Sequence, residues 1–261
     1  MIRRLCHNRD LGGRRIGAQM GKGVFVTGTD TGVGKTVVTA CLVSIFAKRG
    51  FDVGVMKPVE TGCHKRNHRL VPRDVAFLKA VSGSGDPLSL INPYRFSKPL
   101  APLIAAAIDH KNIEVKRIRS AYQKLIEKHD ILFVEGAGGL LVPLVGKLTN
   151  LDLILELNLP VLLVVGSKLG AVNHALLTLR WAKENGLKIL GVLINQLYPG
   201  SRKSLLEKTN PELIRSFTEV PILGNVPHIP LLSKPQLLLK PALMRILEAA
   251  IDVERLRVQI V

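Results

Sequence analysis

A glycine-rich turn between an apolar strand and a helix start is the clearest chemical signal in this sequence. The stretch Val24–Val38 reads VFVTGTDTGVGKTVV and contains Gly32, Gly34, Lys35 and Thr36. Glycines let the backbone approach an anion closely and point successive N–H groups at it, and the following helix N-terminus adds positive potential. Lys35 can reach terminal phosphates, and the Thr36 hydroxyl can hold Mg²⁺. The stretch therefore predicts a polyphosphate site.

The turn departs from the strict phosphate-loop pattern G-x-x-x-x-G-K-[ST]. That pattern requires glycine at position 29, where this chain has Thr29, and Gly28 comes one residue too early. An ordinary strand-to-helix turn is the alternative interpretation. The apolar strand before the turn and the helix after it favour a variant phosphate loop.

Two further strand ends offer charged side chains for the same chemistry. Lys57 follows an apolar run and precedes a proline, so beside Lys35 it would concentrate positive charge where phosphoryl transfer develops negative charge. Alternatively, Lys57 leaves the sheet for solvent. Asp74 and Glu135 are candidate Mg²⁺ ligands, because this hard cation prefers a few carboxylate and hydroxyl oxygens. Asp74 could instead be a helix N-cap, whereas an acid at the end of a buried strand, as Glu135 is, needs a partner.

The elements that must position these residues alternate between strand and helix. The predicted strands are 23–27, 53–57, 131–134, 161–165, 189–194 and 221–224. The predicted helices are 35–49, 74 onward, 101–109, 114–129, 150–158, 172–184, 201–217 and 241–261. We interpret the polar stretch up to Pro72 as a long active-site loop and residues 92–96 as a connector.

This alternation predicts an α/β fold with one doubly wound, mostly parallel sheet covered by helices on both faces. Ligands in such sheets bind at the carboxyl ends of the strands. The polar segments 28–36, 57–62, 135–139, 166–168 and Asn195 all follow predicted strands. We therefore expect them to meet in one crevice.

Composition limits the possible classes of protein. The chain has 261 residues, 47% of them hydrophobic, which suits one large domain. Its net charge is +17, from 37 basic and 20 acidic residues, so its surface should attract anions. The basic residues are spread along the chain and aromatic residues make up only 4%, so we expect no specific nucleic-acid binding.

Cysteine use and hydropathy indicate a soluble, cytoplasmic protein without a membrane span. Cys6, Cys41 and Cys63 form no C-x-x-C pair, which suggests a reducing compartment and no zinc site. The longest apolar region, Leu151–Val165, is interrupted by two acids and is too short to cross a bilayer. Residues 1–19 contain five arginines and one acid. A transit peptide is possible there, but we predict a dispensable, poorly ordered extension before a single domain at 20–261.

Four segments in consistent order closely resemble the dethiobiotin synthetase family. They are TGTDTGVGKT at 27–36, KPVETG at 57–62, EGAGG at 135–139 and GSKLGAVNHA at 166–175, within a similarity from about Gly23 to His228. The resemblance implies a fold like that of P-loop NTPases and a homodimeric ligase of biotin biosynthesis. Its substrates would be ATP with Mg²⁺, CO₂ or bicarbonate, and 7,8-diaminononanoate, whose ureido ring would close through a carbamate and a carbamic-phosphate anhydride.

The resemblance also assigns roles to individual residues. The catalytic residues would be Lys57 and Lys35, and the metal would be held by Thr36, Asp74 and Glu135. ATP would contact Gly32, Val33, Gly34, Lys35, Thr36, Val37, Asp74, Glu135, Gly136, Ala137, Gly138, Asn195, Gln196, Pro227, His228 and Ile229. The diamine substrate would contact Thr31, Thr61, Gly170, Ala171, Val172 and Asn173. The last four lie at a helix start, which suits a carboxylate, and in the family the partner subunit holds that end of the substrate.

Two departures from the family concern the nucleotide. Where the family commonly has Asn-Asp, this chain has Asn195-Gln196, and residues 228–240 contain no acid. Base and ribose recognition, and hence nucleotide preference, could therefore differ.

Two alternative functions share this fold. A regulatory ATPase of the partition or septum-positioning kind carries a signature lysine early in the loop, where this chain has Asp30. An amidotransferase-coupled synthetase would need a further glutaminase domain, for which the chain has no room.

Overall fold

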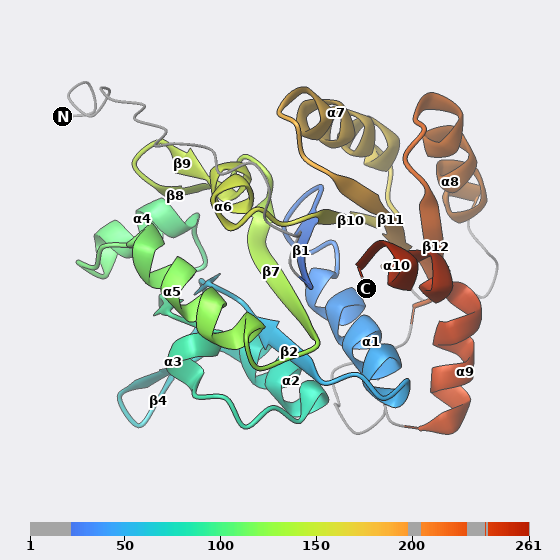
Figure 1. Cartoon of the computed structure of the whole chain (residues 1–261). Helices are drawn as coiled ribbons and strands as arrows, with labels where there is room; N and C mark the ends of the chain where they lie inside the picture. The colour runs from blue at the N-terminus through green and yellow to red at the C-terminus, as the bar shows by residue number, and fades with distance from the viewer. Residues whose placement is uncertain (1–21, 198–204, 229–237, 239, 261) are drawn as a thin grey trace.

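A six-stranded parallel sheet forms the centre of the protein (Figure 1). The computed structural model describes residues 22–197, 205–228, 238 and 240–260. The sheet order is β12-β11-β10-β1-β7-β2. The strands are β1 (Gly23–Gly28), β2 (Val53–Met56), β7 (Ile131–Gly139), β10 (Val161–Gly166), β11 (Ile189–Asn195) and β12 (Ile222–Val226). The predicted extension at 1–19 lies outside the described residues, as do Ile229 and the predicted helix start at 201–204.

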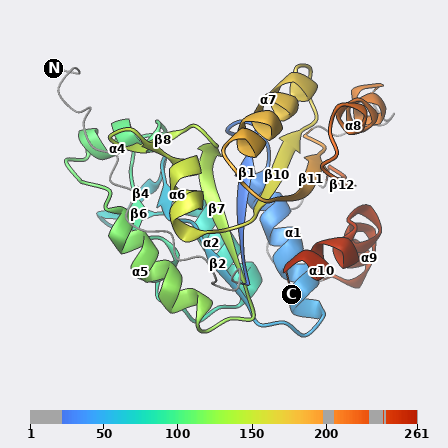
Figure 2. The same cartoon turned by 45° about the horizontal axis from the view of Figure 1, so that its top comes forward.

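Helices cover both faces of this sheet, which confirms the predicted doubly wound α/β class (Figures 1 and 2). On one face pack α1 (Lys35–Lys48), α2 (Arg73–Ser82), α9 (Pro241–Ala250) and α10 (Val253–Ile260). On the other face pack α5 (Val115–Ile126), α6 (Asn150–Leu157), α7 (Ala171–Glu184) and α8 (Leu205–Phe217). Two short helices, α3 (Leu88–Ile91) and α4 (Pro102–Ile108), flank the β2 side. The strands are buried on both faces, as their continuous apolar runs predict.

Consecutive residues of β1 show how the core divides between these faces. Val24 and Val26 pack in the cluster with α1, whereas Phe25 packs in the cluster with α5 and α6. This alternation follows from the two-residue side-chain period of a strand. Because the six strands are parallel, the residues that follow their carboxyl ends, which carry the predicted chemistry, lie at one edge of the sheet.

The region after β2 has more structure than the predicted loop and connector. β3 (Val59–Glu60) pairs in parallel with β6 (Tyr94–Arg95), inside the predicted connector. β4 (His64–Arg66) and β5 (Arg69–Val71) form an antiparallel hairpin. Asn67 and His68 have φ of 48° and 60°, the left-handed conformation that a two-residue hairpin turn requires. The sequence lacks the usual glycine at this turn, so the hairpin was not predicted.

Two other elements differ from their predicted bounds. β7 continues to Gly139 because its glycine-rich end still pairs with β1, Val26 opposite Glu135 and Gly28 opposite Gly139. Glu135 is therefore part of a strand and not of the turn after it. The predicted C-terminal helix is divided into α9 and α10 at Ile251, which is extended and bridges to Gly224. A further small hairpin, β8 (Pro143–Val145) with β9 (Leu148–Thr149), precedes α6. Within the described ranges, no helix is long and apolar enough to cross a membrane.

Candidate active site

The glycine-rich turn joins β1 to α1 at the carboxyl edge of the sheet. Gly32 and Gly34 have φ of 76° and 87°, a conformation that favours glycine. No side chain in the described part of the chain caps α1 at Gly34, so N–H groups of its first turn remain for an anion. A Cβ at Gly34 would lie 2.0 Å from the Asn195 amide nitrogen. The turn thus needs glycine at position 34 for both its backbone angle and its close packing.

Lys35 folds back over this turn. Its ammonium donates to the Asp30 carbonyl at 3.0 Å, and the residue is only 6% exposed. Burial lowers the pKa of Lys35 to about 8, and the attraction of Glu135 only partly opposes this effect. Among the described residues no carboxylate bonds directly to Lys35, and a buried ammonium of this kind is suited to an anionic ligand.

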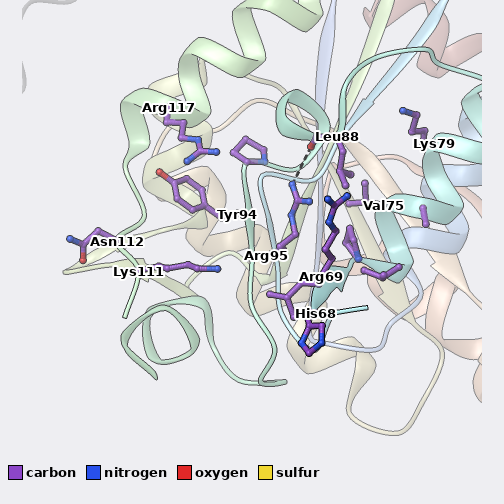
Figure 3. Close-up of a pocket in the computed structure, with 15 residues that line it drawn as sticks. His68, Arg69, Val75, Lys79, Leu88, Tyr94, Arg95, Lys111, Asn112 and Arg117 are labelled. Atoms are coloured by element: carbon purple, nitrogen blue, oxygen red, sulfur yellow. Dashed lines mark hydrogen bonds between the residues drawn. The ribbon is translucent and has the colours of Figure 1, made fainter. Parts of the chain in front are cut away.

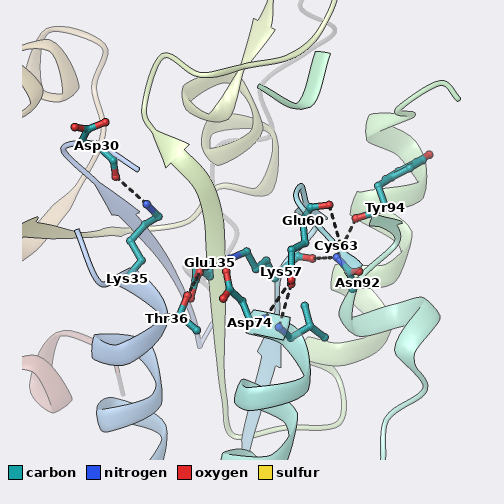
Figure 4. Close-up of polar contacts among 11 residues, drawn as sticks. Asp30, Lys35, Thr36, Lys57, Glu60, Cys63, Asp74, Asn92, Tyr94 and Glu135 are labelled. Carbon is teal, nitrogen blue, oxygen red and sulfur yellow. Dashed lines mark hydrogen bonds and ion pairs between the residues drawn. The ribbon is translucent and has the colours of Figure 1, made fainter. Parts of the chain in front are cut away.

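Four side chains from four elements meet beside the turn (Figure 4). Lys57, directly after β2, forms ion pairs with Glu135 of β7 at 2.7 Å and with Asp74 of α2. The Thr36 hydroxyl of α1 donates to the same Glu135 oxygen at 2.8 Å. Burial alone would lower the pKa of Lys57, but Glu135 and Asp74 outweigh it and raise the pKa. Lys57 is therefore a buried, charged residue, and the alternative of a solvent-directed lysine is wrong.

A cavity of about 680 Å³ opens onto this cluster. Of the predicted site residues, it is lined by Thr31, Gly32, Gly34, Lys35, Thr36, Lys57, Thr61, Asp74, Glu135, Gly136, Ala137 and Gly138. The polyphosphate, metal and catalytic predictions thus converge on one space, whose size is typical of small-molecule sites.

Comparisons with known proteins agree with this site. A family model described as "AAA domain" matches residues 22–236. The chain is 40% identical, over 84% of its length and 93% of the relative's, to the ATP-dependent dethiobiotin synthetase BioD of Thermodesulfovibrio yellowstonii. It is 38% identical to the enzyme of that name from Bacillus velezensis, over 78% of this chain and 86% of the relative. The chain belongs to the dethiobiotin synthetase family.

Solved structures of other proteins share the fold of this dethiobiotin synthetase family member. The septum site-determining protein MinD of Pyrococcus horikoshii, complexed with Mg-ADP, superposes with a TM-score of 0.55 at 17% identity, over 92% of this chain and 98% of that one. A ParA family ATPase of Chlorobium tepidum gives 0.53 at 17% identity, over 90% and 99%. At this identity the likeness concerns the fold alone.

The carboxylates of this family member fit a divalent cation. Glu135 is fully buried, and its Oε2 atom lacks a hydrogen-bond partner among the described residues. An unpartnered buried carboxylate oxygen is costly, and a cation would satisfy it. The described residues contain no cluster of three or more His, Cys, Asp or Glu side chains placed for a metal. Two carboxylates and the Thr36 hydroxyl instead form a sparse oxygen set, which suits Mg²⁺ because this ion keeps several waters.

The predicted base-binding residues lie behind the phosphate loop and do not line the 680 Å³ cavity. Asn195 is buried, and its amide donates to the Val33 carbonyl at 3.1 Å. The Gln196 side chain accepts a bond of 3.4 Å from the His228 N–H. Pro227 follows β12, and Val37 is half-buried in α1. The expectation of one common crevice is therefore too simple, because β11 and β12 end on the other side of the loop.

The predicted carboxylate site at the start of α7 is also outside that cavity. Gly170 has φ of 85° and precedes the helix, with Ala171, Val172 and Asn173 in its first turn. Lys168, just before it, pairs with Asp30 of the phosphate loop at 3.0 Å. The α7 start thus contacts the loop from the side opposite Lys57 and Asp74.

Sequence reasoning missed two buried residues that hold the cluster in place. Glu60 is 4% exposed and accepts hydrogen bonds from the N–H groups of Asp74 and Val75 at 3.1 and 3.0 Å. Asn92 is fully buried and donates to the Lys57 carbonyl at 2.7 Å. The polar types of these residues were visible in the sequence, but no local spacing connected them to their partners.

Asp74 itself is not the N-cap of its helix, which was the alternative interpretation. The cap position of α2 is Pro72, and Asp74 lies in the first turn with its carboxylate on Lys57. Glu60 provides the capping contacts instead.

Proposed function

We propose that this chain carboxylates 7,8-diaminononanoate and closes its ureido ring by way of a carbamate and a carbamic-phosphate anhydride. ATP-dependent synthesis of dethiobiotin in biotin biosynthesis, a ligase reaction, follows from family membership. The observation that carries the finer proposal is the placement of Lys35 and Lys57 on one cavity with the Thr36, Asp74 and Glu135 oxygens.

The chemistry requires positive charge where two anions must meet. One amine attacks the carbon of CO₂ and loses a proton, which gives a carbamate. A carbamate oxygen then attacks the γ-phosphorus of ATP, and the bond to ADP breaks. Lys57 and Lys35 lower the repulsion between the carbamate and the γ-phosphate and stabilise charge in the transition state. The second amine then attacks the carbonyl carbon and loses a proton as phosphate leaves.

The loop residues Gly32–Val37 bind the phosphates through their N–H groups in this proposal. Thr36, Asp74 and Glu135 would hold Mg²⁺, which supplies charge neutralisation at the β- and γ-phosphates. Gly136, Ala137 and Gly138 would border the phosphates, and Thr31 and Thr61 would bind the diamine. Asn195, Gln196, Pro227, His228 and Ile229 would contact the nucleoside. Asn195 would then stabilise the phosphate loop through the Val33 carbonyl and also contact the adenine base.

We further propose a homodimer in which Gly170–Asn173 of one subunit bind the substrate carboxylate at the site of the other. Exposed apolar side chains support a contact surface beside the phosphate loop. Leu141, Leu177 and Trp181 are 56%, 61% and 44% exposed and line a shallow cavity of about 380 Å³ together with Thr31. Such a patch next to a functional loop is typical of an interface.

A regulatory ATPase of the partition kind is the second candidate, since such proteins share the fold. The place of their signature lysine is taken by Asp30, whose carboxylate pairs with Lys168 and whose carbonyl accepts from Lys35. A lysine at position 30 could not make the carboxylate contact with Lys168. This arrangement favours the synthetase.

Phosphate release from ATP and Mg²⁺ tests the proposal. We expect release only when both the diamine and bicarbonate are present, with dethiobiotin identified by mass spectrometry. Hydrolysis that needs neither substrate and is stimulated by DNA or membrane vesicles would instead support the regulatory ATPase.

We also propose that residues 1–19 are dispensable and that the enzyme acts in the cytoplasm. Deletion of these residues should leave the rate of dethiobiotin formation unchanged. A loss of activity in the shortened but folded chain would assign a function to the extension.

A further inference from the structure

A second cavity lies between the β4–β5 hairpin, α2 and the segments around residues 93–95 and 111–117 (Figure 3). Its volume is about 950 Å³. Its cationic lining consists of Arg69, Lys79, Arg95, Lys111 and Arg117, with His68 beside them, and we call it the basic cavity. None of these residues belongs to the proposed synthetase site.

Charge in the basic cavity is unbalanced. Within the described part of the chain, none of the residues that line it is acidic. Arg69, Arg95, Lys111 and Arg117 form no ion pair with any described residue. Like charges gathered in one hollow repel one another, and an anionic ligand would relieve that repulsion.

Two of these arginines are held in place before any ligand binds. Arg95 is partly buried and donates to the Asn92 carbonyl at 2.8 Å. The Arg117 guanidinium lies 5.0 Å from the centre of the Tyr94 ring (Figure 3). The Tyr94 hydroxyl in turn accepts a hydrogen bond from the Glu114 N–H at 2.9 Å. A guanidinium fixed in this way still has free N–H donors, in the fork geometry that matches phosphate or carboxylate.

The environment of Arg95 agrees with an uncompensated charge. Burial lowers the pKa of Arg95 and the charge of Arg117 lowers it further, although Cys63 and Glu60 act in the opposite direction. An anion in contact with Arg95 would reverse this shift.

Apart from Tyr94 and Asn112, the remaining lining of the basic cavity is apolar. It includes Leu70, Val71, Val75, Leu88 and Pro93. A hollow of this volume, with apolar walls and a few fixed polar groups, has the properties of a small-molecule site. An extended polyanion would instead need a basic stripe across an open face.

We propose that the basic cavity binds a small organic anion that carries at least two phosphate or carboxylate groups. Arg95 and Arg117 bind its acid groups, Lys111 and Arg69 close over them from the rim, and the apolar walls contact its carbon skeleton. The site is separate from the phosphate loop and binds while that loop is filled.

Calorimetric titration of the full chain tests this proposal. The phosphate loop is first saturated with Mg²⁺ and a non-hydrolysable ATP analogue, so that it cannot take up a second anion. Fructose 1,6-bisphosphate and citrate are then titrated separately, which distinguishes a phosphate site from a carboxylate site. We expect one of them to bind with a 1:1 ratio and to weaken as NaCl rises from 50 to 200 mM.

The variant Arg95→Gln/Arg117→Gln should weaken that binding at least tenfold. Because Arg95 also has a structural hydrogen bond, Arg69→Gln/Lys111→Gln provides a second pair of exposed positions, with an expected loss of at least threefold. Arg119→Gln is the control: it removes one positive charge from α5 at a residue that does not line the basic cavity, and it should not change the affinity. Absence of binding by both anions, or an equal loss in the control, would overturn the proposal.

Discussion

The carboxylate of Glu60 caps the helix that carries Asp74. It accepts the N–H groups of Asp74 and Val75 at 3.1 and 3.0 Å, directly beside the ion pair of Lys57 with Asp74. Burial raises the pKa of Glu60, and the charge of Lys57 opposes that rise. The buried Glu60 thus fixes the position of Asp74, a carboxylate of the proposed metal site.

Replacement of Glu60 should affect both stability and the metal requirement. Glu60→Ala removes both capping contacts, and loss of a cap costs about 1 kcal/mol in the free energy of unfolding. Because Asp74 is then less well placed, the Mg²⁺ concentration for half-maximal activity should rise several-fold. Urea denaturation and a Mg²⁺ titration of phosphate release measure the two effects.

Asp252→Ala is a matched control, because Asp252 accepts the Arg255 N–H at the start of α10, and α10 does not line the active-site cavity. It should lose comparable stability while its Mg²⁺ requirement stays unchanged. An equal Mg²⁺ shift in both variants would mean that Glu60 acts only through stability.

Lys57→Met should abolish dethiobiotin formation and destabilise the fold. The change leaves the carboxylate of Glu135 buried without its cationic partner, which costs about 3 kcal/mol or more. Addition of Glu135→Gln should recover much of that stability, because the buried carboxylate that had lost its partner is then neutral. The double variant should recover no activity. Thermal unfolding of the single and double variants measures these changes in stability. Unchanged dethiobiotin formation by Lys57→Met would exclude Lys57 from the mechanism.

Asn195→Ala should weaken the binding of ATP more than the binding of inorganic tripolyphosphate. Loss of the bond to the Val33 carbonyl loosens the loop and lowers affinity for both ligands. Loss of the proposed base contact lowers affinity for ATP only. Binding titrations with both ligands separate the contributions, and equal losses would limit Asn195 to bracing the loop.

Stability should decline above neutral pH because of His129. Its ring nitrogens lie 2.9 Å from Asp52 and 2.6 Å from Asp86, and Lys128 also pairs with Asp86 at 3.0 Å. Burial lowers the pKa of His129, but the hydrogen bonds with Asp86 and Asp52 outweigh it and raise the pKa above 6.5. The stabilisation is therefore complete below pH about 6.5 and is lost as pH rises through the raised pKa.

The variant His129→Gln should flatten the fall in unfolding free energy between pH 6 and 8, as measured by urea denaturation at each pH. His110→Asn, at an exposed position with φ of 51°, is the control and should keep the slope of the parent chain. If His129→Gln kept the pH dependence of the parent chain between pH 6 and 8, the assignment of that dependence to His129 would be contradicted.

Asp86 affects stability at acid pH. Although burial raises its pKa, hydrogen bonds from Ser84 and His129 lower it to about 2, so its contribution is lost as pH falls from about 4 toward 2.

Leu177→Arg should convert the proposed dimer to a monomer. Leu177 is 61% exposed beside Trp181 and Leu141, and a charge there would be buried without a partner in the interface. Phe217→Arg is the control, because Phe217 is 71% exposed on α8, outside that patch. Sedimentation should give half the mass of the parent protein for Leu177→Arg only. An unchanged mass for Leu177→Arg would mean that the dimer interface lies elsewhere.

The fold class and the phosphate loop follow from the order of amino acids alone. The apolar runs that became β1, β7, β10 and β11 are short and bounded by turn residues, which favours buried strands. Gly34-Lys35-Thr36 belongs to a local motif whose function depends on neighbours in the chain. Charged residues after further apolar runs made Lys57, Asp74 and Glu135 candidates for the same site, and family resemblance then assigned their roles.

Tertiary structure decided how the distant residues meet. Glu60 caps a helix that starts 13 residues later, and Asn92 binds the carbonyl of Lys57 across 35 positions. Neither partner can be found by spacing, because the contacts depend on the parallel pairing of β3 with β6. The basic cavity likewise arises only when the β4–β5 hairpin, α2 and the start of α5 come together. Local motifs are encoded by short-range geometry, whereas buried polar pairs and cavities depend on how the whole sheet and its helices pack.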